Sequence, residues 1–209
     1  MLSSPEMPAL ILRYALKRDG REETAVAVTA SSVQRFRMPD RETKAHFVNA
    51  VLDAHCGQDE ELELFGEDVA RLRPAARARL RRRVGVLTPA VPLISNLNAW
   101  ENISLPAAYH GTPPLREIAE AARQALVALG ADPERLLARL PDDLGMFEKK
   151  LVEFTRLLVA APDLVVFDAL GDDLDPEEHA RAARFEAEYL ARQPAGTLIY
   201  VDLRERRRS

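Results

Sequence analysis

The sequence has little cysteine, no long apolar run and little net charge. Cys56 is the only cysteine among 209 residues, which excludes an intramolecular disulfide and fits a reducing compartment. No uninterrupted apolar stretch approaches the roughly 18 residues that a transmembrane helix needs. The N-terminal segment also lacks the apolar core of a signal peptide. We therefore expect a cytoplasmic protein that meets the inner face of a membrane, if at all, only through a partner.

The formal net charge of −4 does not indicate wholesale binding to nucleic acid. One segment, residues 73–83 ("RPAARARLRRR"), is nevertheless strongly basic and could suggest a nucleic-acid partner. Acidic segments flank this stretch and no aromatic side chains accompany it to stack bases, so we interpret it as a solvated basic helix and expect no nucleic-acid partner. With 47% apolar and 30% charged residues, the composition is typical of a soluble globular protein.

Strand and helix patterns alternate along most of the chain. A hairpin is expected over 9–16 and 24–30, followed by strands at 32–38, 61–69, 84–87, 164–167 and 196–203. Apolar residues at helical spacing predict helices at 43–55, 73–83, 115–130, 146–161 and 176–193. Strands that alternate with helices in this way indicate an α/β fold with a largely parallel sheet, preceded by an antiparallel part.

Several phrases resemble the nucleotide-binding subunits of ABC transporters. The stretch "ELELFGEDVARLRPAARARLRRRVGVL" is similar to the family's segment between the phosphate loop and the glutamine loop. The phrase "LISNLNAWENISLPAAYHG" resembles the following segment, in a form typical of the lipid- and lipoprotein-exporting branch. The phrases "PDLVVFDALGDDLD" and "GTLIYVDL" resemble the Walker B strand with its D-loop and the strand before the switch histidine.

This resemblance implies the fold class and the domain organisation. We expect an α/β, P-loop NTPase-like fold with a mostly parallel sheet, an antiparallel β N-terminal part and a helical lobe. Residues 1–209 would form one ABC ATPase-like domain, with the helical lobe inserted at about 89–160. Function must still be argued from the residues of the site, because one fold carries many functions.

The phosphate loop of this family reads G-x-x-x-x-G-K-[ST], since glycines let backbone N–H groups close around phosphates. Aligned on this pattern, "MPDRETKA" places Met38 and Thr43 at the glycines, Lys44 at the lysine and Ala45 at the metal-binding hydroxyl. Asp40 and Glu42 add negative charge where phosphates would lie. We interpret the stretch as an ordinary helix start that Asp40 caps through N–H groups at or near residues 42 and 43.

At most of the other catalytic positions, too, the residue that the family uses for nucleotide binding or hydrolysis is replaced. Thr88 stands at the glutamine of the glutamine loop and fits a turn after a strand. The signature motif falls on 144–148, "LGMFE", whose Met146 and Phe147 fit core positions better than ligand positions. Asp168 is retained at Walker B, but Ala169 replaces the catalytic glutamate, which removes the general base. The switch histidine falls at Leu203.

Lys44 and Asp168 are thus the two retained candidates for cofactor binding, and we interpret both as vestigial. We predict no catalytic residue, no metal site and no cofactor, with ATP and Mg²⁺ as a disfavoured possibility. Tyr14 stands near the position of the adenine-stacking aromatic, but it fits a strand tyrosine better. His46, His55, His110 and His179 show no ligand spacing.

The leading interpretation is a non-catalytic subunit that serves a membrane transport or lipid-trafficking complex. It would dock on an ABC permease, or pair with a competent ABC ATPase subunit. Two alternatives remain open: a weak ATPase whose sites a partner subunit completes, and a regulator that has left transport. Residues 93–109, with apolar Leu93, Ile94, Leu97 and Trp100, are the predicted permease-facing surface; the alternative is that they pack into the core of their own lobe.

Overall fold

The computed structural model describes residues 10–19, 21–110 and 114–204, and in this part of the chain the strands form two four-stranded sheets. The first is antiparallel, in the order β2-β1-β4-β5, with β1 at Leu10–Arg18, β2 at Arg21–Thr29, β4 at Glu60–Leu64 and β5 at Glu67–Asp68. The second is parallel, in the order β3-β8-β7-β6, with β3 at Val33–Met38, β8 at Thr197–Leu203, β7 at Leu164–Asp168 and β6 at Val84–Leu87. The predicted fold class is confirmed.

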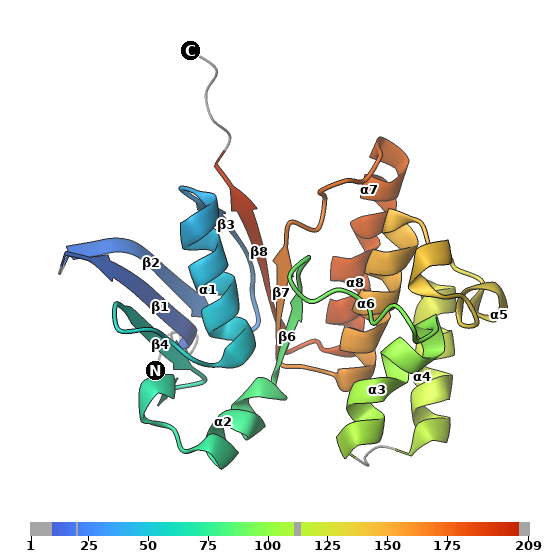
Figure 1. Ribbon diagram of the computed structural model, residues 1–209, viewed down its shortest axis with the longest axis horizontal. Helices are drawn as coiled ribbons and strands as arrows, with labels where there is room; N and C mark the ends of the chain where they lie inside the picture. The colour runs from blue at the N-terminus through green and yellow to red at the C-terminus, as the bar shows by residue number, and fades with distance from the viewer. Residues whose placement is uncertain (1–9, 20, 111–113, 205–209) are drawn as a thin grey trace, which may run out of the picture.

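Eight α-helices are described, arranged around the parallel sheet. They are α1 at Arg41–Asp53, α2 at Pro74–Arg81, α3 at Ala99–His110, α4 at Leu115–Ala128, α5 at Pro133–Leu136, α6 at Met146–Ala160, α7 at Pro176–Ala182 and α8 at Arg184–Arg192. Helix α1 lies between the two sheets and packs on β3, β6 and β8 (Figure 1). Helices α6 and α8 cover the opposite face of the parallel sheet, and α3 and α4 pack outside α6 (Figure 1).

The central strands divide the interior into two hydrophobic cores. Along β7, Leu164 and Val166 face the core that contains α1 and the antiparallel sheet, whereas Val165 and Phe167 face the core under α6. This is the two-residue period of a strand that is buried on both faces, and all five residues of β7 are buried. In the second core the rings of Phe154 and Phe185 stack with their centroids 4.3 Å apart.

Two helix predictions need correction. The predicted helix at 176–193 is divided at Ala183 into α7 and α8, although the backbone of Ala183 keeps right-handed helical angles. Helix α3 was not predicted, because Pro106 stands inside it and proline removes a helical hydrogen bond. Helices α3 to α6 fall within the range expected for a helical lobe. That residues 1–209 form one domain stays a prediction.

Glu153 of α6 is buried, and burial raises its pKa to about 7 against the opposing effect of Arg156. In the unfolded chain the carboxyl loses its proton near its ordinary value of 4.5. Between these two values the folded state binds more protons than the unfolded state, so the free energy of unfolding falls as pH rises and levels off above about 7.

We therefore expect Glu153→Gln to stabilise the protein at pH 8 and to have little effect near pH 4.5. The gain should grow with pH to at most about 3 kcal/mol, since one pKa unit corresponds to about 1.4 kcal/mol. Urea unfolding of both proteins at several pH values measures the difference. A difference that does not change with pH would contradict the prediction.

Candidate functional site

The turn between β3 and α1 occupies the position of the phosphate loop, and it is closed. Only Pro39 and Asp40 separate the last residue of β3 from the first residue of α1. Asp40 is the N-cap, and its Oδ1 accepts a hydrogen bond of 2.8 Å from the backbone N–H of Thr43. This bond lowers the pKa of Asp40 and keeps it ionised. The predicted helix start with Asp40 as its cap is confirmed.

Side chains fill the space that a phosphate loop keeps open. Met38 belongs to the core around α1, and Thr43 is only 1% exposed. Because both stand at glycine positions of the motif, backbone N–H groups here cannot close around an anion without displacing packed side chains. The N–H of Lys44 is also in use, since it donates to the backbone oxygen of Asp40 at 3.1 Å.

Three residues that are far apart in the sequence meet beside this turn. Lys44 Nζ lies 2.7 Å from Asp168 Oδ1, and the two side chains are 16% and 10% exposed. Thr88, which follows β6, donates from Oγ1 to Asp168 Oδ2 at 2.6 Å. The cluster Lys44–Asp168–Thr88 thus joins the start of α1 to the carboxyl ends of β7 and β6. The carboxylate that would ligate a metal is engaged by a lysine and a hydroxyl of the same chain.

The Lys44 contact is an ion pair and not an aligned hydrogen bond, since Asp168 Oδ1 has no hydrogen-bond partner in the described part of the chain. Thr88 was predicted to form a turn after its strand, and its Oγ1 does accept from the N–H of Ala90. Its bond to Asp168 was not predicted. A threonine side chain is short, and nothing in the sequence indicates which strand end it faces.

The segment after Asp168 is held by a buried lysine. Ala169 lies at the position of the catalytic glutamate with a positive φ of 54° and is 5% exposed. Lys150 of α6 donates from Nζ to the backbone oxygens of Ala169, Leu170 and Asp172 at 3.2, 2.8 and 2.8 Å. Burial lowers the pKa of Lys150, and nearby carboxylates, Asp172 first, oppose this effect. The ammonium therefore fixes the start of this loop through three carbonyls.

The start of α6 occupies the position of the signature motif. Its first backbone N–H groups would face an anion, but Glu148 Oε2 accepts from the N–H of Gly145 at 2.9 Å. Glu148 Oε1 also binds Arg139 Nη1 at 2.6 Å. Phe147 is a core residue as predicted, whereas Met146 is exposed, so the prediction for Met146 was wrong. Met146 is the first residue of the helix and is not among its buried residues, which include Leu151 and Phe154.

Tyr14 is not available to stack a base. It is fully buried in β1, its ring packs edge-on against Phe47 with centroids 5.2 Å apart, and its hydroxyl donates to Glu60 Oε1 at 3.0 Å. The prediction of a strand tyrosine is confirmed. At the switch position, Leu203 is the last residue of β8 and pairs with Met38 of β3.

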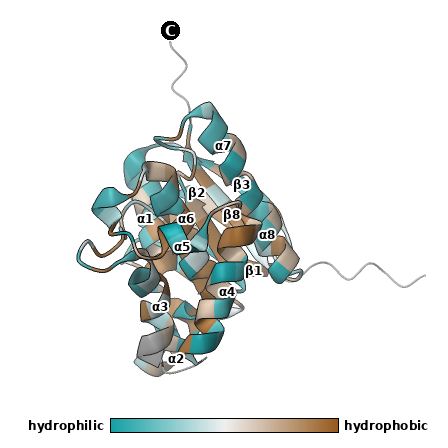
Figure 2. Cartoon of the chain, turned by 90° about the vertical axis from the view of Figure 1, so that its right-hand side faces the viewer, coloured by the Kyte–Doolittle hydropathy of each residue, from teal (hydrophilic) through white to brown (hydrophobic). Residues whose placement is uncertain are grey.

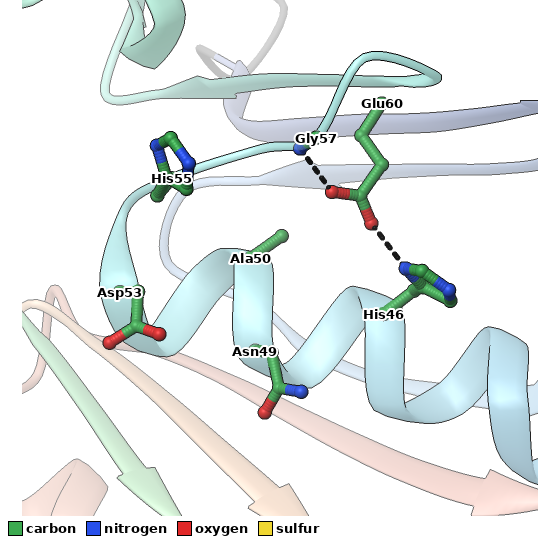
Figure 3. A pocket seen from close by; sticks show the side chains of 7 residues that line it. All are labelled: His46, Asn49, Ala50, Asp53, His55, Gly57 and Glu60. Atoms are coloured by element: carbon green, nitrogen blue, oxygen red, sulfur yellow. Dashed lines mark hydrogen bonds and ion pairs between the residues drawn. The ribbon is translucent and has the colours of Figure 1, made fainter.

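A small hollow of about 140 Å³ lies between α1 and the turn that precedes β4 (Figure 3). Glu60 is its hydrogen-bonding centre: it binds His46 Nδ1 at 3.0 Å and the N–H of Gly57 at 2.7 Å. His55 and Asp53 point away from this pair (Figure 3). Across residues 10–19, 21–110 and 114–204, histidine, cysteine and acidic side chains nowhere gather in threes in a metal-binding arrangement. We therefore interpret the hydrogen bonds of Glu60 as a structural link between α1 and β4.

The predicted permease-facing segment is partly exposed and partly core. Leu93 is buried in the core under α6, Leu97 and Trp100 are half-buried, and Ile94 is 43% exposed. Leu105 of α3 is also 43% exposed. Side chains at 108–110, which include His110, lie outside the described residues. Packing into the lobe's own core is confirmed for Leu93, whereas docking of the exposed part on a permease stays a prediction.

The backbone of this segment is fixed by one buried asparagine. Asn102 donates from Nδ2 to the backbone oxygens of Ile94, Leu97 and Asn98, and its Oδ1 accepts from the N–H of Ile94. Asn98 and Glu101 exchange reciprocal hydrogen bonds that start α3 as a capping box. The loop from β6 to α3 therefore presents its apolar side chains on a rigid support. No helix of the described part is long and apolar enough to cross a bilayer.

Comparison with known proteins identifies the family. No protein-family model matches the chain. An uncharacterised ABC transporter ATP-binding protein of Escherichia coli K12, YbbA, is 32% identical over 146 residues, which are 69% of this chain and 62% of YbbA. The methionine import ATP-binding protein MetN of Mesorhizobium japonicum is 32% identical over 117 residues, which are 56% of this chain and 31% of MetN. The chain thus spans less than two thirds of these relatives.

Solved structures support the same fold. The protein cbiO1 of Clostridium perfringens, described as part of the ABC transporter complex cbiONQ, superposes with a TM-score of 0.74 and 18% identity over 93% of this chain and 79% of cbiO1. The ATP-binding cassette MJ0796, solved as a dimer bound to ADP and Pi, gives a TM-score of 0.72 at 18% identity over 92% of this chain and 88% of the cassette. The chain belongs to the family of ABC transporter ATP-binding proteins.

The two retained residues give a sharp test of the cluster. Lys44→Met and Asp168→Asn should each cost about 2–3 kcal/mol of folding free energy, because each leaves a nearly buried polar partner without its counterpart. The double variant should lose less than the sum of the two, with a coupling above about 1 kcal/mol. Urea unfolding of the four proteins measures the cycle.

The control is a cycle on Lys17 and Glu61, an ion pair whose side chains are 41% and 60% exposed. Its coupling should be far smaller, because solvent screens exposed pairs. Additive losses at Lys44 and Asp168 would show that the cluster does not act as a unit.

Proposed function

We propose that this ABC-type subunit does not hydrolyse ATP and serves as a scaffold subunit of its complex. The observation that carries the proposal is the cluster Lys44–Asp168–Thr88. In it, the lysine for the phosphates and the carboxylate for the metal are 2.7 Å apart and neutralise each other. Binding Mg-ATP would require both to exchange this contact for new ones.

Two further features support the proposal, because both helix starts that would hold phosphates already hold carboxylates of the chain. Asp40 caps α1 at Thr43, and Glu148 binds the N–H of Gly145 at the start of α6. Like charges about 4 Å apart repel by about 4 kcal/mol even at an effective dielectric of 20. A triphosphate would have to displace these groups before it gained any helix-dipole attraction.

The chemical step also lacks its base. Ala169 offers no proton acceptor, and removal of a general base alone slows a reaction by roughly 10²–10⁴. A glutamate introduced there would be placed at a left-handed backbone angle beside buried neighbours. Reversion of this one residue would therefore not recreate the catalytic geometry.

The partner that fits the exposed part of the loop is an ABC permease at the inner face of a membrane. Val91, Ile94 and Leu105 are exposed apolar residues on the loop after β6 and on α3, and Asn102 holds the backbone of this loop rigid. A preformed apolar surface of this kind suits a helix of a partner, since little ordering entropy is lost on docking. Service in lipid or lipoprotein export, indicated by the phrase "ENISLP", stays a prediction.

A second candidate function is weak ATP binding in a site that a partner subunit completes. The observation that favours it is the survival of Lys44 and Asp168 in contact with each other. This candidate differs from the scaffold proposal in one respect. Nucleotide binding must break the contact between Lys44 and Asp168, and contacts from the partner subunit must offset the free energy that this costs.

Melting in the presence of millimolar Mg-ATP separates the two. A ligand at one hundred times its dissociation constant stabilises the folded state by about 2.7 kcal/mol, which is several degrees at about 2–4 °C per kcal/mol. We expect a shift below about 1 °C that Lys44→Ala does not change, and no phosphate release above a buffer control. The ATP-induced melting shift of the wild type is compared with that of the variant Asp40→Gly/Glu42→Gly/Thr43→Gly, which restores glycines to the phosphate-loop position and removes the two carboxylates.

A rise of several degrees in melting temperature with Mg-ATP, abolished by Lys44→Ala, would contradict the scaffold proposal. It would favour an ATP site that a partner subunit completes. So would steady-state hydrolysis that Asp168→Asn removes.

The proposed docking surface, formed by Val91, Ile94 and Leu105, can be tested by introducing charged side chains. Ile94→Asp with Leu105→Asp should reduce co-purification of this protein with an ABC permease by at least tenfold, because a desolvated apolar contact would be replaced by a charge. The matched control is Leu115→Asp with Val127→Asp on α4, two side chains that are 55% and 62% exposed. Equal capture by both double variants would contradict the assignment of the surface.

A further inference from the structure

A second and larger hollow, of about 440 Å³, lies on the helical side of the molecule and shares no residue with the cluster Lys44–Asp168–Thr88. Arginines from three segments line it: Arg135 of α5, Arg139 in the turn after α5, and Arg181 of α7. Two carboxylates, Asp132 and Glu148, also contribute to its wall. Its size lies in the range of small-molecule sites. Helices α5 and α7 are mainly hydrophilic on the side that Figure 2 shows.

The two carboxylates of the wall are already engaged. Asp132 Oδ1 accepts from the N–H groups of Glu134 and Arg135 at 3.0 and 3.4 Å and thereby caps α5. Glu148 binds Arg139 and the N–H of Gly145. In the described part of the chain neither Arg135 nor Arg181 forms an ion pair, so the uncompensated charge of the hollow is positive.

One of these guanidinium groups is held in place before any ligand arrives. Arg181 lies over the ring of Phe147 with its central carbon 4.1 Å from the ring centroid, and Phe147 is a buried core residue. A guanidinium that stacks on a ring by its face keeps the N–H groups on its edge available to other acceptors. These N–H groups match the oxygens of a phosphate in a planar, two-pronged contact.

A fourth arginine, outside the wall of the hollow, lies close to Gly130. Gly130, which also lines the hollow, has φ of +79°, and Arg184 Nη1 lies 3.4 Å from the point where a β-carbon on Gly130 would stand. The absence of a side chain at Gly130 thus leaves room for the guanidinium of Arg184 beside the hollow. Three arginines line this one hollow in a chain whose formal net charge is −4.

We propose that this hollow binds a small phosphate-bearing molecule, with Arg181 and Arg135 as its main ligands. The phosphate would draw together α5 and α7, which lie in different parts of the sequence, and Leu136 and Leu151 of the wall offer apolar contact to the rest of the molecule. The phosphate can come from a free inorganic anion or from an organic phosphate ester. The apolar part of the wall favours the ester.

Titration calorimetry at constant ionic strength tests the proposal on the full chain, with inorganic phosphate, pyrophosphate and glycerol 3-phosphate as separate probes. We expect saturable binding of at least one probe. Arg135→Ala with Arg181→Ala should weaken it at least tenfold, and Arg181→Lys, which keeps the charge but not the planar fork, should weaken it severalfold. Tighter binding of glycerol 3-phosphate than of both inorganic probes identifies an ester site, and the reverse order identifies an inorganic one.

The control is Arg79→Ala with Arg82→Ala, which removes the same charge from exposed positions at α2, on the far side of the molecule (Figure 1). It should leave binding unchanged. Because Arg181→Ala removes packing on Phe147, Arg135→Glu provides a second variant at an exposed residue, and it should also abolish binding. No saturable heat with any probe, or an equal loss in the α2 control, would overturn the proposal.

Discussion

The structure depends on the neutralisation of Asp168 inside the protein. A carboxylate at the end of a strand that is buried on both faces must be hydrogen-bonded or paired, because an isolated buried charge is too costly to keep. A magnesium ion would meet this demand in a working ATPase. Here Lys44 and Thr88 meet it from within the chain. They also tie α1 and the end of β6 to β7, so the carboxylate stabilises the fold in place of a ligand.

Charged side chains of the protein also satisfy backbone groups elsewhere around this cluster. Asp40 and Glu148 satisfy N–H groups at the starts of α1 and α6, and Lys150 satisfies three carbonyl groups at and after Ala169. Each is a charge-assisted contact of the kind that a nucleotide or its metal would otherwise make. Without such a ligand, the fold must satisfy these groups internally or leave them unpaired at a cost of about 1–3 kcal/mol each.

Much of the fold was predictable from the sequence, because each strand carries a pattern that only one arrangement satisfies. The apolar run 164–167 of β7 predicted a strand buried on both faces, and its alternation divides the two cores. Local signals also predicted the Asp40 cap. The contacts of Lys150 and Thr88 were not predictable, since they join residues 19 to 80 positions apart. The one available signal was a lysine, Lys150, among the apolar positions of α6.

The hydrogen bond from Thr88 to Asp168 also restrains the loop that follows β6. Thr88 begins the loop that leads from β6 to α3, and Asn102 holds the rest of that loop through Ile94 and Leu97. Both ends of the segment with the exposed apolar residues are therefore anchored without a ligand. A coupling surface that must move with nucleotide needs two arrangements of similar free energy. The buried contacts of Asp168 favour a single arrangement, which is what the proposed scaffold function requires and what a nucleotide-driven motor would have to avoid.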